Sequence, residues 1–129
     1  DKQHNIWCAT EHGLVKIYKN FSHKLFNKDN GLAGVDISSV ICDYEGEIWV
    51  SCFGNGVYKL TNEALSVYTK QHGLNDNRVI AFCKKNEGFL FSTTSGLNNF
   101  NNGIIEPVTL PKELTEDIIT ALFLDGTTL

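Results

Sequence analysis

The sequence predicts an all-β protein built from three similar units of about 42 residues, each folded as a four-stranded antiparallel sheet. A strand-like phrase recurs at a fixed interval, as Ile6–Thr10, Ile48–Cys52 and Phe89–Thr93. Trp49 follows Trp7 by 42 positions, and the third copy follows the second by 41. No segment shows helical periodicity longer than about two turns, which argues against helical repeats of similar length. The period and the short strands together are typical of the blades of a β-propeller.

Each unit is expected to contain four short strands, of which the first is an almost unbroken apolar run. Such a run fits a strand covered on both faces, as the strand nearest a propeller axis is. The second strand is the recurring phrase itself, rich in β-branched and aromatic residues. The fourth is the most polar, and Pro107 fits there because proline lacks an N–H and belongs on an edge strand. The expected first strands are 37–42, 79–83 and 118–124, the third strands 15–18, 57–60 and 97–100, and the fourth strands 23–26, 65–68 and 104–108.

The three units fill the chain, and we expect them to form part of one β-propeller domain. Their approximate ranges are 1–42, 43–84 and 85–129, so the chain begins and ends near the same phase of the repeat. Propellers close with typically about 4–8 blades, so three blades leave two faces uncovered. We therefore expect the chain to be excised from a longer protein whose remaining blades complete the ring, or copies of it to complete each other.

Composition argues against several classes of function. The net charge is −4, the pI is near 5.5 and no basic patch stands out, so nucleic acid is not an expected partner. No apolar run approaches the about 18 residues that a membrane span needs. The cysteines form no C-x-x-C pair, so neither a metal site nor a cofactor is expected. We expect free thiols in the core, with one disulfide as the alternative, at Cys8, Cys42, Cys52 and Cys83.

Several repeated residues are expected to serve the structure. The two tryptophans are large and recur within a strand, so we expect them to pack between neighbouring sheets. An Asp and a Gly bound a four-residue segment typical of a type I turn, and a further glycine follows each recurring phrase after a short gap. These structural candidates are Trp7, Trp49, Asp43, Gly46, Gly13 and Gly56.

One face of a propeller carries both the loops between second and third strands and the loops between units, and we place a candidate ligand site there. Amides, a carboxylate and an exposed aromatic ring suit a hydroxyl-rich ligand, although Asn, Asp and Gly are also ordinary turn formers. A metal or catalytic pair of histidines is an alternative that no ligand spacing supports, and no catalytic residue is predicted. The ligand-binding candidates are Phe53, Asn55, His12, His72, Asn75, Asp76 and Arg78.

The middle unit resembles the two-component regulator propeller repeat. The resemblance covers the whole chain but is weaker in the third unit, where Lys85, Leu90 and Glu113 replace Asp, Trp and Gly. The residues that carry it in the middle unit are Gly31, Leu32, Ile37, Val40, Asp43, Gly46, Ile48, Trp49, Gly56, Val57 and Tyr58.

The resemblance implies a sensor rather than an enzyme. Such repeats form the periplasmic sensor region of hybrid two-component histidine kinases, ahead of an Ig-like domain, a membrane span and the kinase. It therefore implies a periplasmic location, a role in signal transduction, an oligosaccharide or other small ligand, and a homodimer as a further expectation. Two alternatives stay open, because fold does not decide function: a propeller for protein–protein contact or dimerisation without its own ligand, and a propeller-type lyase or glycosidase.

Overall fold

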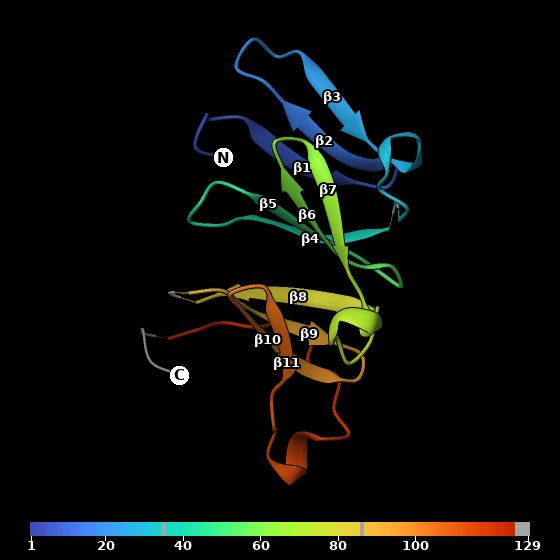
Figure 1. Ribbon diagram of the computed structural model, residues 1–129, viewed down its shortest axis with the longest axis vertical. Coiled ribbons are helices and arrows are strands. Elements are labelled where there is room, and N and C mark those ends of the chain that lie inside the picture. The colour runs from blue at the N-terminus through green and yellow to red at the C-terminus, as the bar shows by residue number, and fades with distance from the viewer. Residues whose placement is uncertain (35, 86, 126–129) are drawn as a thin grey trace.

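Three antiparallel sheets follow one another along the chain (Figure 1). The computed structural model describes residues 1–34, 36–85 and 87–125, and it confirms an all-β protein. In that part of the chain, helical structure is limited to three short 3₁₀ segments, η1 (Lys28–Asn30), η2 (Lys70–His72) and η3 (Lys112–Leu114). The strands pair in chain order within each sheet: β1 (Ile6–Thr10), β2 (Gly13–Ile17) and β3 (His23–Phe26); β4 (Ile37–Cys42), β5 (Ile48–Cys52), β6 (Gly56–Thr61) and β7 (Ala64–Tyr68); β8 (Val79–Lys84), β9 (Phe89–Thr93), β10 (Gly96–Asn101) and β11 (Ile104–Pro107).

The recurring phrase forms the second strand of each complete sheet. Every residue of β5 and of β9 is buried, because each of these strands pairs on both sides and is covered on both faces. Trp49 lies opposite Ile41 on β4 and opposite Lys59 on β6. The turn that leads into β5 closes with the Gly46 N–H donating to the Asp43 carbonyl at 3.2 Å, and Gly46 has a φ of +96°, which favours glycine.

Neighbouring sheets meet at their inner strands. β1 lies against β4, and β4 lies against β8. The Ser38 hydroxyl donates to the Val79 carbonyl at 2.9 Å, which joins β4 of the second sheet directly to β8 of the third. Both strands carry a register shift at this point, between Ile37 and Ser39 and between Val79 and Ala81. The sheets are therefore packed side by side rather than paired into one continuous sheet.

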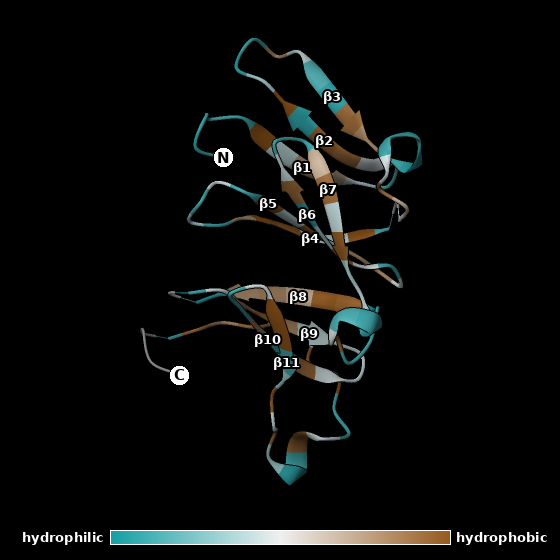
Figure 2. Cartoon of the chain, in the orientation of Figure 1, coloured by the Kyte–Doolittle hydropathy of each residue, from teal (hydrophilic) through white to brown (hydrophobic). Residues whose placement is uncertain are grey.

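The core consists of apolar layers between successive sheets. Trp49 is 1% exposed, and its ring centroid lies 4.7 Å from that of Phe100 and 5.1 Å from that of Phe89 on the next sheet. The layer between the first and second sheets contains Leu14, Phe26 and partly buried Trp7. Figure 2 shows that hydrophobic residues concentrate in the strands and hydrophilic residues in the turns. Burial of these rings is the main stabilising contribution to each interface between sheets.

Two expectations about strands were wrong. Among the described residues, the first sheet has three strands rather than four, and no strand forms over 118–124. The apolar side chains of this segment still pack, because Ile119, Leu122 and Leu124 lie against the cluster of Cys83, Leu90 and Leu97. A strand also needs backbone hydrogen-bond partners, and no described strand pairs with this segment.

The sheets are offset from the expected repeat ranges. β4 ends the first range, 1–42, but pairs with β5 of the second range, 43–84. Residues 126–129 of the third range lie outside the described residues. All four cysteines are free; Cys52 and Cys83 are buried, as expected of core thiols, whereas Cys8 and Cys42 are half-buried. No helix among the described residues is long and apolar enough to cross a membrane.

Candidate functional site

The loops predicted to bind a ligand lie along one edge of the three sheets. This edge, called the loop edge here, carries η1 and η2, at the right of Figure 1, together with the β5–β6 and β9–β10 turns. The opposite edge, called the turn edge, carries the β4–β5, β6–β7, β8–β9 and β10–β11 turns.

Asp76 and Arg78 form a complete ion pair on the loop edge. The Arg78 side chain donates from Nε to Asp76 Oδ1 and from Nη2 to Oδ2, both at 3.0 Å, and its backbone N–H donates to Oδ1 at 2.8 Å. Ser95 adds a hydroxyl donor at 3.3 Å from Oδ2. The bidentate guanidinium holds the pKa of the Asp76 carboxyl well below its ordinary value. Because the Arg78 side chain is 51% exposed, it still presents a donor edge to solvent.

Asn75 is engaged in holding its loop. Its backbone N–H donates to Asn98 Oδ1 at 3.0 Å, and its side-chain amide donates to the Leu97 carbonyl at 3.3 Å. Asn98 is fully buried and donates in turn to the Gly73 carbonyl at 3.2 Å. Asn98 thus fixes the loop between η2 and β8, a role that the sequence analysis missed. A buried polar residue at an otherwise apolar strand position is the signal that could have indicated it.

His72 caps a turn. Its Nδ1 accepts the backbone N–H of Thr69 at 3.0 Å, and the Thr69 hydroxyl accepts the Gln71 N–H at 3.3 Å. Asn27 and Asn30 form the same reciprocal cap at η1. The cap leaves only Nε2 of His72 for another partner. His12 lies in the exposed turn after β1, with Nε2 3.8 Å from Glu11, and no hydrogen bond or ion pair in the described part of the chain joins it to His72.

Phe53 and Asn55 share the loop edge with the Asp76–Arg78 pair. The Gly56 N–H donates to the Asn77 carbonyl at 2.8 Å, so the β5–β6 turn touches the loop that leads to β8. Phe53 is 43% exposed, and the Asn55 amide bends back to the Phe53 carbonyl at 3.4 Å. An exposed ring, an amide and a guanidinium edge can stack on and hydrogen-bond to a hydroxyl-rich molecule.

The groups behind this edge include a buried thiol. Burial, and then the charge of Asp36, raise the pKa of the Cys52 thiol to about 12, so it is a poor nucleophile. Among residues 1–34, 36–85 and 87–125, no group of three or more His, Cys, Asp and Glu side chains could hold a metal ion.

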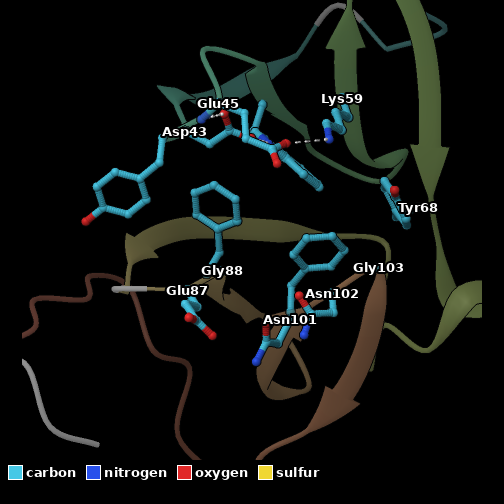
Figure 3. Close-up of a pocket in the computed structure, with 13 residues that line it drawn as sticks. Asp43, Glu45, Lys59, Tyr68, Glu87, Gly88, Asn101, Asn102 and Gly103 are labelled. Atoms are coloured by element: carbon cyan, nitrogen blue, oxygen red, sulfur yellow. Dashed lines mark hydrogen bonds and ion pairs between the residues drawn. The ribbon is translucent and has the colours of Figure 1, made fainter.

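The turn edge carries two grooves that the sequence analysis did not foresee. The first groove, between the first and second sheets, has a volume of about 420 Å³ and is lined by residues that include Trp7, Lys16 and Glu63. The second groove, between the second and third sheets, has a volume of about 340 Å³ (Figure 3). Its lining includes Trp49, Lys59, Tyr68, Phe100, Asn101 and Gly103.

The repeated aspartate fixes the tryptophan at the back of each groove. Asp43 Oδ2 accepts the Trp49 indole N–H at 2.8 Å, and Oδ1 accepts the backbone N–H groups of Glu45 and Glu47, both at 2.9 Å. Asp1 accepts the Trp7 indole N–H in the same way, also at 2.8 Å. The carboxylates of Asp1 and Asp43 therefore hold the two tryptophan side chains in place.

The fold matches known extracellular sensor domains. The sequence matches no family profile and no curated protein. Among solved structures, the extracellular domain of BT3049 from B. thetaiotaomicron, assigned as a hybrid two-component system, aligns over 78% of this chain with a TM-score of 0.69 and 19% identity. Two crystal structures of the extracellular domain of BT4673 from the same organism, assigned as a one-component and as a hybrid two-component system, align over 97% with TM-scores of 0.77 and 0.74 and 18% identity. The chain shares the fold of these sensor domains. It spans only 14–17% of the length of those chains.

Proposed function

We propose that the chain is a run of about three β-propeller blades from the extracytoplasmic sensor of a hybrid two-component regulator. The observation that carries the proposal is the structural alignment over 78–97% of the chain with extracellular domains of such systems. The repeat of about 42 residues and the side-by-side packing of β4 against β8 agree with a radial arrangement of blades. The function is signal reception, and the module lies outside the cytoplasmic membrane in the intact protein.

The loop edge is the proposed contact surface for a hydroxyl-rich ligand such as an oligosaccharide. Phe53 offers an exposed ring, and Arg78 offers a guanidinium edge that Asp76 keeps in place. Their backbones are held by cross-loop hydrogen bonds, so little ordering accompanies binding.

An enzyme-fusion experiment tests the location and the role together. Alkaline phosphatase, which is active only outside the cytoplasm, is inserted after Asn102 or Asn20 of the intact protein, in turns between strands. We expect phosphatase activity at both positions, and we expect deletion of residues 1–125 to abolish the transcriptional response to the inducing glycan. A fusion that is inactive at both positions, although it accumulates to normal levels, would refute the sensor assignment.

A further inference from the structure

The two grooves of the turn edge are equivalent by register. Lys16 lies opposite Trp7 in the β1–β2 pair, and Lys59 lies opposite Trp49 in the β5–β6 pair. In both cases the lysine Nζ is 5.3 Å from the centroid of the tryptophan ring. Each groove therefore contains one ammonium group beside one buried or partly buried indole, and the two can be compared directly.

The first groove supplies its own counter-charge. Glu63, in the β6–β7 turn of the second sheet, places Oε1 3.4 Å from Lys16 Nζ and also accepts a hydrogen bond from Tyr18 at 3.4 Å. Lys24 pairs with the other carboxylate oxygen. The hydrogen bond from Lys24, reinforced by Lys16, lowers the pKa of the Glu63 carboxyl. A carboxylate from the neighbouring sheet thus closes the first groove.

The second groove lacks this carboxylate. The turn residues Asn62 and Glu63 correspond to Asn102 and Gly103, with φ values of +49°, +66°, +50° and +81° in that order. Gly103 takes the place of Glu63, and a Cβ added to it would meet no atom within 4 Å. The space that a glutamate side chain enters in the first groove is open in the second, next to Lys59 (Figure 3).

Lys59 is left with a weak partner. Its side chain is 23% exposed, and the carboxylate paired with it in the described part of the chain is Glu45 at 4.0 Å, whose side chain is 80% exposed. Glu45 and Glu87 belong to the rim, and Asp43 is engaged by Trp49 and the backbone. The groove therefore offers a weakly paired cation beside aromatic rings.

We infer that the second groove binds a small monocarboxylate of sugar-acid size, with an apolar C–H face. The ligand carboxylate takes the position that Glu63 occupies in the first groove and pairs with Lys59. The C–H face of the ligand lies against Tyr68 and Phe100. The rim carboxylates weaken binding by repulsion and select against ligands with more than one negative charge. The inference deepens the proposed sensor role by naming a ligand class, but the binding can be tested without that role.

Titration of the purified chain with D-glucuronate, followed by NMR or calorimetry, tests the site. We expect glucuronate to bind, D-glucose to bind at least tenfold more weakly, and Lys59→Met to abolish the difference. Lys16→Met is the matched control, because Glu63 already occupies the equivalent place, and it should leave glucuronate binding unchanged. Glu45→Gln should strengthen binding severalfold.

A second pair of variants keeps the inference falsifiable. Gly103→Glu restores the built-in carboxylate and should abolish glucuronate binding, whereas Gly103→Gln, which has the same size without charge, should retain measurable binding. Gly103→Glu should also melt at a higher temperature than Gly103→Gln, with a difference that disappears in about 1 M salt. Glucuronate binding that survives Lys59→Met, equal binding of glucose, or no binding of glucuronate would each overturn the inference. None of these results would affect the fusion experiment, which tests the sensor role separately.

Discussion

At the residue scale, the molecule uses its charged groups mainly to fix its loops. Asp76 is the clearest case, because its carboxylate receives three hydrogen bonds from Arg78 and one from Ser95. The sequence analysis grouped Asp76 and Arg78 as ligand-binding candidates, and the geometry shows them satisfying each other. The part of this pair open to a ligand is the exposed edge of the guanidinium.

The Asp76–Arg78 pair should make stability depend on pH in acid. The pKa of the Asp76 carboxyl is lower in the folded chain than the value of about 3.9 in an unfolded chain. The contribution of the ionised Asp76 carboxylate to the free energy of unfolding is therefore fully present above about pH 4. It is lost as the pH falls below that value toward the lower pKa of the folded chain. We expect Asp76→Asn to lower the melting temperature at pH 7. The difference in melting temperature between the variant and the native chain should be smaller at pH 2.5.

Asp29→Asn serves as the control, because Asp29 is exposed and forms no ion pair in the described residues. It should melt like the native chain at both pH values. If Asp76→Asn lowered the melting temperature equally at pH 7 and pH 2.5, the Asp76–Arg78 pair would not be the cause of the loss of stability in acid.

At the element scale, the turn before β5 and the tryptophan within β5 act as one unit. The Trp49 indole N–H is 2.8 Å from Asp43 Oδ2, and the ring is 1% exposed. In the third sheet both partners are replaced, Asp43 by Lys85 and Trp49 by Leu90. Lys85 Nζ donates to Asn99 Oδ1 at 3.0 Å. Replacement of both partners avoids an unsatisfied buried donor, which explains why the weaker third repeat still folds into the same sheet.

A double-mutant cycle measures this coupling. Asp43→Ala leaves the indole N–H and two backbone N–H groups without their acceptor, and we expect it to cost about 2–3 kcal/mol of unfolding free energy. In a Trp49→Leu background the same substitution should cost about 1 kcal/mol less, because the buried N–H is gone. Urea unfolding of the four proteins gives the cycle. If the changes in unfolding free energy of the two substitutions were strictly additive, the indole hydrogen bond would contribute nothing to stability.

At the scale of the whole molecule, stability should be uneven across the stack of sheets. β5 and β9 pair on both sides and are buried throughout, whereas β1 of the first sheet pairs on one side and has no fully buried residue. The segment 118–124 packs its side chains on the third sheet but has no paired backbone in that part of the chain. The interior of the stack is therefore better protected than its two outer sides.

Hydrogen exchange measures this gradient. We expect the amides of β5 and β9 to exchange most slowly, and those of 118–124 and of the side of β1 that faces away from β2 to exchange at least about a hundredfold faster. Proline-free peptides from β5 and 118–124 can be compared within one sample by mass spectrometry. Equal protection of 118–124 and β8 would show that this segment pairs as a strand in solution.

The sequence by itself determined the all-β class, the three units and most strand positions, because these depend on local alternation, turn residues and a regular period. It could not determine whether 118–124 forms a strand, because apolar patterning sets burial while strand formation needs a hydrogen-bonded neighbour. Nor could it show that Asn98 holds a loop, or that Gly103 stands where Glu63 does beside a lysine of the preceding sheet. These facts join residues from different strands or different sheets, so only the tertiary structure decided them.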